Sequence, residues 1–127
     1  MNQGLIEVHD GAENDLVAIA DDLIADAERV ALSEVPYDEW GGFQVAKKIG
    51  DEGYETVKIP KNVKTFSPAM RELEAAIKSG RFQHDGNPIL SWMVGNTVAR
   101  EDANGNVFPR KETNAKKIDG LVALLMG

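Results

Sequence analysis

Short β-rich runs alternate along this chain with stretches whose apolar residues recur every three or four positions. The clearest stretch of the second kind runs from Asn14 to Arg29. It carries one apolar stripe, typical of an amphipathic helix, made of Leu16, Ile19, Ala20, Leu23, Ile24 and Ala27. Strands that alternate with helices favour a mainly parallel sheet covered by helices. The pattern therefore predicts an α/β fold.

The remaining elements follow from local signals. β-rich runs predict strands at 4–8, 30–37 and 54–59, and an Asn-Gly pair predicts a hairpin with arms at 97–100 and 107–108. Capping and breaking residues predict four helices. Two of them are expected at 40–49 and 88–94, a third starts at Ser67–Pro68 and is capped by Gly80, and the last covers 115–126 after Asn114. Because a helix connects the strands at 30–37 and 54–59, these two strands should pair in parallel. With no repeat and no long linker, residues 1–127 are expected to form a single domain.

Composition narrows the classes of protein further. Of the 127 residues none is Cys and two are His, so a disulfide scaffold, a thiolate zinc site and a Cys nucleophile are excluded, and a His-built metal site is not expected. No apolar run approaches the roughly 20 residues of a membrane-spanning helix, which predicts a soluble, intracellular protein without a membrane partner.

Charge is divided unevenly along the chain. The net charge is −7, but the first 55 residues hold 14 acidic and 3 basic residues, and the rest hold 7 acidic and 11 basic ones. An acidic protein has no general attraction to phosphate backbones, although the basic second half could present a local surface to DNA. Solvated helix faces of either sign explain the same pattern.

Several familiar motifs are absent. The chain contains no phosphate-binding loop of the P-loop ATPases, no glycine-rich dinucleotide fingerprint and no nucleophile elbow. The run from Asp102 to Asn106 faintly resembles a calcium loop. However, Val107 and Thr113 stand where such a loop needs Gly and Glu, so a calcium site is not expected.

Two carboxylates remain as candidates for chemistry. Asp38 directly follows a predicted strand, and ligands bind at the carboxyl ends of strands in open α/β sheets. Asp119 lies in an otherwise apolar helix face, where its charge is costly unless it is paired or binds a cation. Together they would suit Mg²⁺ or Mn²⁺. Two simpler explanations stay open: Asp38 is a cap of the helix at 40–49, and the charge of Asp119 only complements a helix dipole.

Several segments, in this order and spacing, resemble the C-terminal nuclease domain of tailed-phage terminase large subunits. They are Tyr37–Trp40, Thr65–Glu74, His84–Pro88, Trp92–Asn96, the turn at Asp102–Asn106 followed by Pro109 and Lys111, and Lys117–Leu124. The resemblance covers nearly the whole chain. It implies a ribonuclease-H-like fold, with a mixed, mainly parallel sheet, that cuts concatemeric viral DNA during genome packaging.

The resemblance also implies roles for individual residues. Asp38 and Asp119 match the family's acidic metal ligands, which would make them catalytic residues of a two-metal centre with Mg²⁺ or Mn²⁺. Four other positions match the family pattern and imply contact with DNA or support of the site: His84, Asn87, Asn96 and Lys111. The expected partners are double-stranded DNA, the terminase small subunit and the portal, in the cytoplasm of a bacterial host.

The chain departs from the family pattern at its start. The ATPase motor and the first nuclease strand, which carries another metal ligand in the family, are not found, so an N-terminally truncated domain with weak or no activity of its own is expected. An exposed sheet edge would then invite pairing with a second copy. The alternatives are a non-catalytic prophage remnant and a small α/β interaction module. A close approach of the Asp38 and Asp119 carboxylates would argue against the latter.

Overall fold

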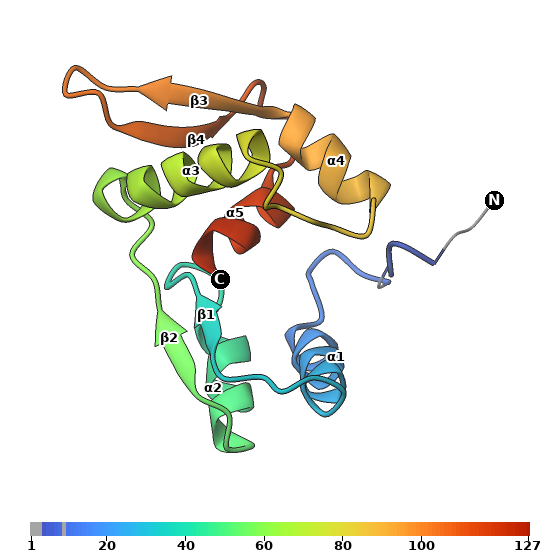
Figure 1. Ribbon diagram of the computed structural model, residues 1–127. Helices are drawn as coiled ribbons and strands as arrows, with labels where there is room; N and C mark the ends of the chain where they lie inside the picture. Colours follow the sequence, from blue (N-terminus) through green and yellow to red (C-terminus); the bar gives the residue numbers. More distant parts are fainter. Residues whose placement is uncertain (1–3, 9) are drawn as a thin grey trace. The chain divides into compact units, whose positions relative to one another are not determined.

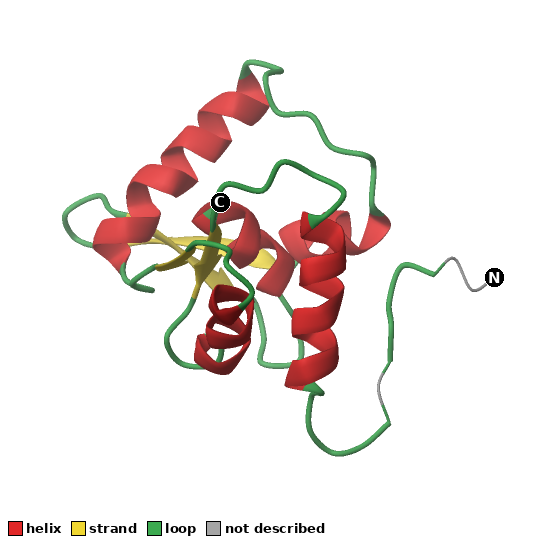
Figure 2. Ribbon diagram, turned by 90° about the horizontal axis from the view of Figure 1, so that it is seen from below, coloured by secondary structure: helices red, strands yellow, loops and turns green. Residues whose placement is uncertain are grey.

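A computed structural model describes residues 4–8 and 10–127, in which helices outweigh strands (Figures 1 and 2). The chain forms two compact units, residues 1–60 and residues 61–127. Its fold is α/β, as predicted. The prediction of one domain over residues 1–127 stays a prediction. Within the described ranges, no helix is long and apolar enough to cross a membrane.

Residues 1–60 contain a two-stranded parallel sheet and two helices. The elements are α1 (Leu16–Ala27), β1 (Val35–Tyr37), α2 (Phe43–Asp51) and β2 (Thr56–Lys58). Val35 pairs with Thr56 and Tyr37 with Lys58, and α2 connects the two strands (Figure 1). The parallel pairing of these two strands confirms the expectation from the connecting helix.

α1 begins where its sequence signals place it. The Asp15 carboxylate accepts hydrogen bonds from the backbone N–H groups of Val17 and Ala18, both at 3.0 Å, and so caps the helix. Ala20 and Ala27 of the predicted stripe are buried, whereas Leu23 at its edge is 40% exposed. An ion pair between Lys48 and Asp21 joins α2 to α1.

Residues 61–127 form the second unit. The elements are α3 (Val63–Lys78), α4 (Pro88–Gly95), β3 (Thr97–Glu101), β4 (Val107–Lys111) and α5 (Asp119–Met126). β3 and β4 pair antiparallel, as the Asn-Gly signal predicts, and the hairpin lies along α3 (Figure 1). Phe66 of α3 is buried and its ring centroid lies 5.6 Å from that of Phe108 on β4. This aromatic pair, with Ile118 and Leu121, forms the core of the unit.

The hairpin turn is organised by one carboxylate. Asp102 accepts hydrogen bonds from the side chain and the backbone N–H of Asn106 and from the N–H of Asn104, and these bonds lower its pKa. Gly105 adopts a φ of +77°, which glycine tolerates without strain. The Arg71 side chain donates to the Gly105 carbonyl and thereby ties the turn to α3.

The predicted start of α3 at Ser67–Pro68 is wrong. The helix begins at Val63, because the Asn62 side chain accepts a hydrogen bond from the Thr65 N–H at 2.9 Å and caps it there. Pro68 lies inside the helix. The buried Ser67 hydroxyl accepts instead from the Val107 N–H of the hairpin, at 3.1 Å. The Ser67 hydroxyl, which the sequence predicts as a cap, therefore makes a tertiary contact instead. Gly80, with φ +70°, follows the helix end as predicted.

The start of the last helix also differs from the prediction. α5 begins at Asp119 rather than at 115, and Asn114 lies in a turn that precedes it. The residue before the helix, Ile118, is buried and has no capping side chain. Its anchoring in the core, and not a local cap, decides where the helix starts.

The predicted mainly parallel sheet is not found as one sheet in the described residues. They contain two separate two-stranded sheets, one parallel and one antiparallel. Residues 4–8 adopt no strand, and the run at 30–37 shortens to β1 because a turn occupies its first residues. Strand propensity alone does not create a strand, since the ladder needs a partner for each hydrogen-bonding group.

Candidate functional site

Asp38 follows β1 directly, at the carboxyl end of the strand where the sequence places it. Its Oδ1 atom accepts a hydrogen bond from the Trp40 N–H at 2.9 Å, and its backbone carbonyl accepts from the Gly42 N–H, also at 2.9 Å. The side chain is half-buried. These bonds hold the Asp38 backbone in a tight turn between the strand and α2.

Glycine is needed at the end of this turn. A Cβ atom on Gly42 would lie 2.8 Å from the Asp38 carbonyl oxygen and 3.1 Å from the Tyr37 Cβ, whereas one on Gly41 would meet nothing within 4 Å. The helix predicted from Trp40 therefore begins at Phe43, and its N-cap is Gly42, without a side-chain bond. Asp38 thus stabilises the turn and does not cap the helix. Trp40 is 93% exposed.

Asp119 is the first residue of α5, and it is exposed. The expected cost of desolvating Asp119 does not arise, because its side chain is exposed while Ile118 and Leu121 are buried. A negative charge at a helix N-terminus is also favoured by the helix dipole, as the simpler explanation of Asp119 holds. Its carboxylate is accessible to a ligand.

The backbone on both sides of Asp119 is held by α4. The Asn96 side chain donates to the Lys117 carbonyl at 3.0 Å, and the Gly120 N–H lies 3.0 Å from the Met93 sulfur. A Cβ on Gly120 would lie 2.8 Å from that sulfur, so a larger residue here would displace the flexible end of the Met93 side chain. Sequence reasoning missed the role of Met93 and Gly120, since no local pattern links residues this far apart in the chain.

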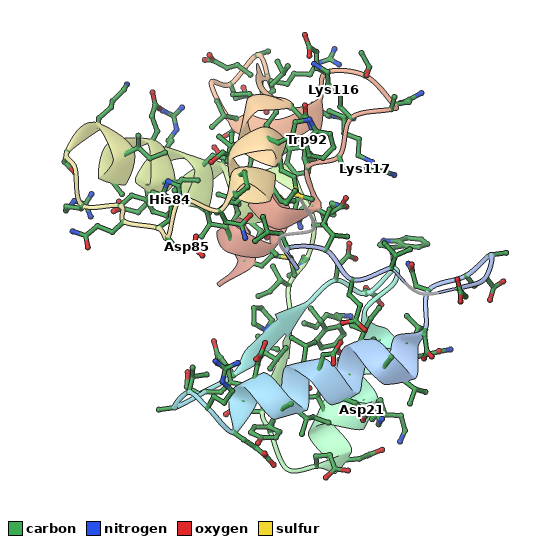
Figure 3. All side chains as sticks on the ribbon, turned by 90° about the vertical axis from the view of Figure 1, so that its right-hand side faces the viewer. Asp21, His84, Asp85, Trp92, Lys116 and Lys117 are labelled. Carbon is green, nitrogen blue, oxygen red and sulfur yellow. The ribbon has the colours of Figure 1, made fainter. Side chains whose placement is uncertain are left out.

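His84 lies in the segment that joins α3 to α4 (Figure 3). Asn87 is the last residue of the same segment. The exposed His84 ring stacks on Phe82 with centroids 5.7 Å apart, and its Nδ1 accepts from the Gly86 N–H. Asn87 caps α4 by accepting from the N–H groups of Ile89 and Leu90. Both residues are therefore engaged in local structure.

The other two candidates differ sharply in exposure. Lys111 is the last residue of β4 and is exposed, so its ammonium group is accessible to a phosphate. Asn96 is only 4% exposed. Lys116 and Lys117, in the loop before α5, add further positive charge to this unit (Figure 3).

Asp38 belongs to residues 1–60 and Asp119 to residues 61–127, and the convergence of their carboxylates stays a prediction. Carboxylate oxygens are the donors that Mg²⁺ and Mn²⁺ prefer, so the chemistry of both side chains fits such an ion. Among residues 4–8 and 10–127, no three His, Asp or Glu side chains gather closely enough to hold a metal ion. Each unit thus offers one of the two predicted ligands.

An apolar pocket lies elsewhere in residues 61–127. It has a volume of about 350 Å³, and its lining includes Met70, Leu73, Ile77, Val94 and Leu121. Glu74 and Lys78, also in its lining, form an ion pair that lowers the pKa of Glu74. None of the predicted site residues lines this pocket.

Comparison with known proteins gives concordant results. A sequence model of the family "Terminase large subunit, endonuclease domain" matches residues 1–127. Protein YmfN of Escherichia coli (strain K12) is 41% identical over 99% of this chain and 28% of its own length. The large terminase subunit of Enterobacteria phage HK97 is 28% identical over 99% of this chain and 25% of its own length.

A crystal structure of the HK97 bacteriophage large terminase agrees with the fold. It superposes with a TM-score of 0.86 at 28% identity, over 98% of this chain and 26% of that one. This chain thus spans about a quarter of the length of the relatives it matches. Because the family model covers the whole chain, this protein belongs to the family of terminase large subunit endonuclease domains.

Proposed function

We propose that this chain is the DNA-cleaving part of a terminase large subunit, and that it cuts concatemeric double-stranded viral DNA by metal-dependent hydrolysis during genome packaging. The observation that carries the proposal is the family match over residues 1–127. The superposition on the HK97 large terminase supports it. A ribonuclease-H-like arrangement of the complete sheet is part of the proposal.

Asp38 and Asp119 are the proposed ligands of Mg²⁺ or Mn²⁺. A bound ion would activate a water molecule and stabilise the leaving oxygen of the phosphodiester. The chain itself supplies a fixed turn at Asp38, held through Trp40 and Gly42, and an accessible carboxylate at the start of α5. Mg²⁺ keeps its water ligands when few carboxylates replace them, so cleavage by this chain alone is expected to be slow.

The proposed partners follow from the family. They are double-stranded DNA, the terminase small subunit and the portal, in the cytoplasm of a bacterial host. A second copy of the chain could pair with the free edge of a two-stranded sheet, because such an edge presents unpaired backbone groups. The exposed Lys111 is the proposed contact to the DNA backbone.

The test is cleavage of supercoiled plasmid with the chain in excess and Mn²⁺ as the metal. We expect slow, Mn²⁺-dependent nicking that Asp38→Asn and Asp119→Asn each reduce to background. Asp26→Asn is the matched control, because Asp26 is an exposed residue of α1 whose ion pair with Arg29 lies on the surface. Nicking that survives both site substitutions would refute these roles, and a folded chain without any Mn²⁺-dependent nicking would refute the proposal that this chain cleaves DNA by itself.

A further inference from the structure

We propose that Asn96 is a positioning residue that sets the place of the Asp119 carboxylate by holding the loop that precedes α5. The inference rests on the proposed function for the role of Asp119. Its structural part rests on contacts within residues 61–127 alone. Asn96 would act through Asp119, without touching the metal or the DNA itself.

Asn96 holds both ends of the loop between β4 and α5. Its backbone carbonyl accepts from the Glu112 N–H at 3.1 Å, where the loop begins. Its side-chain Nδ2 donates to the Lys117 carbonyl at 3.0 Å, where the loop ends. Because the partner is a carbonyl oxygen, only the NH₂ group of the amide can face it. One residue therefore closes the loop at both ends.

Met93 provides a second attachment from the same helix. It lies three residues before Asn96 and so shares a face of α4 with the end of that helix. Its sulfur accepts from the Gly120 N–H at 3.0 Å. Asp119 is thus placed between two attached neighbours, Lys117 on one side and Gly120 on the other.

Asp119 needs such support because its own helix offers little. It occupies the first position of α5, and Ile118 before it contributes no capping side chain. Unsupported first turns fray, and a metal ligand must be held to within about 0.5 Å to bind well. Asn96, at 4% exposure, is too deeply buried to serve as a DNA contact, so holding the loop is the role that its position allows.

The experiment compares Asn96→Ala with the unsubstituted chain by two measurements. Hydrogen exchange reports the amides of Gly120 and Val122, which bond to Met93 and to the Ile118 carbonyl. Mn²⁺-induced broadening of the Gly120 amide signal reports metal affinity beside Asp119. We expect about tenfold faster exchange at these amides, with α3 unchanged, and a 10- to 100-fold weaker Mn²⁺ affinity, as for other residues that orient metal ligands. Higher Mn²⁺ should restore the broadening.

Two further variants keep the test decisive. Met93→Leu keeps the volume but removes the acceptor of the Gly120 N–H, so it should speed exchange at Gly120 directly. It should also weaken the Mn²⁺ affinity, by a smaller factor than Asn96→Ala. Thr97→Val is the matched control: it removes the Thr97 hydroxyl bond to the Met93 carbonyl at the same helix end but leaves the loop attachments in place. It should change neither measurement.

The outcomes separate this inference from the proposed function. Unchanged exchange in a folded Asn96→Ala would overturn the inference, because the loop would then be held without Asn96. Faster exchange with unchanged Mn²⁺ affinity would also overturn it and leave a purely structural role. If the unsubstituted chain bound no Mn²⁺ beside Asp119, the metal-ligand role of Asp119 would be refuted. The positioning role of Asn96 would then be refuted as well, even if hydrogen exchange showed that Asn96 holds the loop.

Discussion

Ser67 joins α3 to the hairpin through a single hydrogen bond. Its hydroxyl oxygen is buried and accepts from the Val107 N–H at 3.1 Å, at the point where β4 begins. The bond also gives a partner to the backbone N–H of a half-buried residue. Ser67 therefore contributes to the attachment of an entire hairpin, and not only to its own helix.

Replacing Ser67 by Ala should lower the free energy of unfolding by about 1–3 kcal/mol, because the Val107 N–H would lose its acceptor. Ser91→Ala is the control, since Ser91 is exposed on α4 and its hydroxyl donates to the Asn87 carbonyl within the same helix turn. That change should stay within about 0.5 kcal/mol. Urea unfolding of both variants measures the difference, and equal effects would contradict the assigned role of Ser67.

At the scale of elements, the boundaries of α3 and α5 are set in different ways. α3 has a capping side chain, Asn62, whose carbonyl oxygen receives the Thr65 N–H. α5 has none, and it starts after the buried Ile118. Both helices contain residues that match the family pattern, at Thr65–Glu74 in α3 and at Lys117–Leu124 around the start of α5. The residue at which each helix starts therefore decides which of these side chains are exposed to solvent.

Asn62→Ala should destabilise the protein by about 1 kcal/mol, because the first turn of α3 loses its cap. Asn114→Ala makes the same chemical change at a residue that resembles a cap in the sequence but lies in a turn before α5. It should change the free energy of unfolding by less than about 0.5 kcal/mol. Thermal or urea unfolding followed by circular dichroism gives both values, and a larger effect at Asn114 would argue that α5 starts earlier.

At the scale of the molecule, the two units differ in charge. Residues 1–60 carry 14 acidic and 4 basic residues, whereas residues 61–127 carry 7 acidic and 10 basic ones. A polyanion such as DNA is repelled by the first unit and attracted by the second. If the proposed function holds, affinity for DNA should depend on basic side chains of residues 61–127.

Lys111→Gln should therefore weaken binding to duplex DNA and lower the slope of log affinity against log salt by about one. Lys47→Gln should leave both unchanged, because Lys47 lies in the acidic unit and pairs with Asp51 on the surface. Fluorescence anisotropy with a labelled duplex at several KCl concentrations measures affinity and slope. Equal losses in the two variants would mean that total charge, and not the basic unit, governs binding.

The elements that sequence reasoning predicted well are those whose signals are local. The stripe of α1, the Asn-Gly turn of the hairpin and the glycine after α3 each need only neighbouring residues, and all three appear in the structure. The parallel pairing of β1 and β2 also follows from a local fact, the helix between them. Membership of the terminase family was also predicted correctly, because the order and spacing of the motifs are properties of the sequence.

Tertiary contacts decided the rest. Ser67 resembles a cap but bonds to Val107, because a residue far along the chain competes for its hydroxyl group. Asp119 starts α5 because the residue before it, Ile118, is buried in the core. The attachments of the loop before Asp119, through Asn96 and Met93, likewise join positions that no local pattern connects. Sequence alone thus determined the family and the candidate ligands, whereas packing determined how Asp119 is held, since a hydrogen-bond partner is chosen only when distant segments meet.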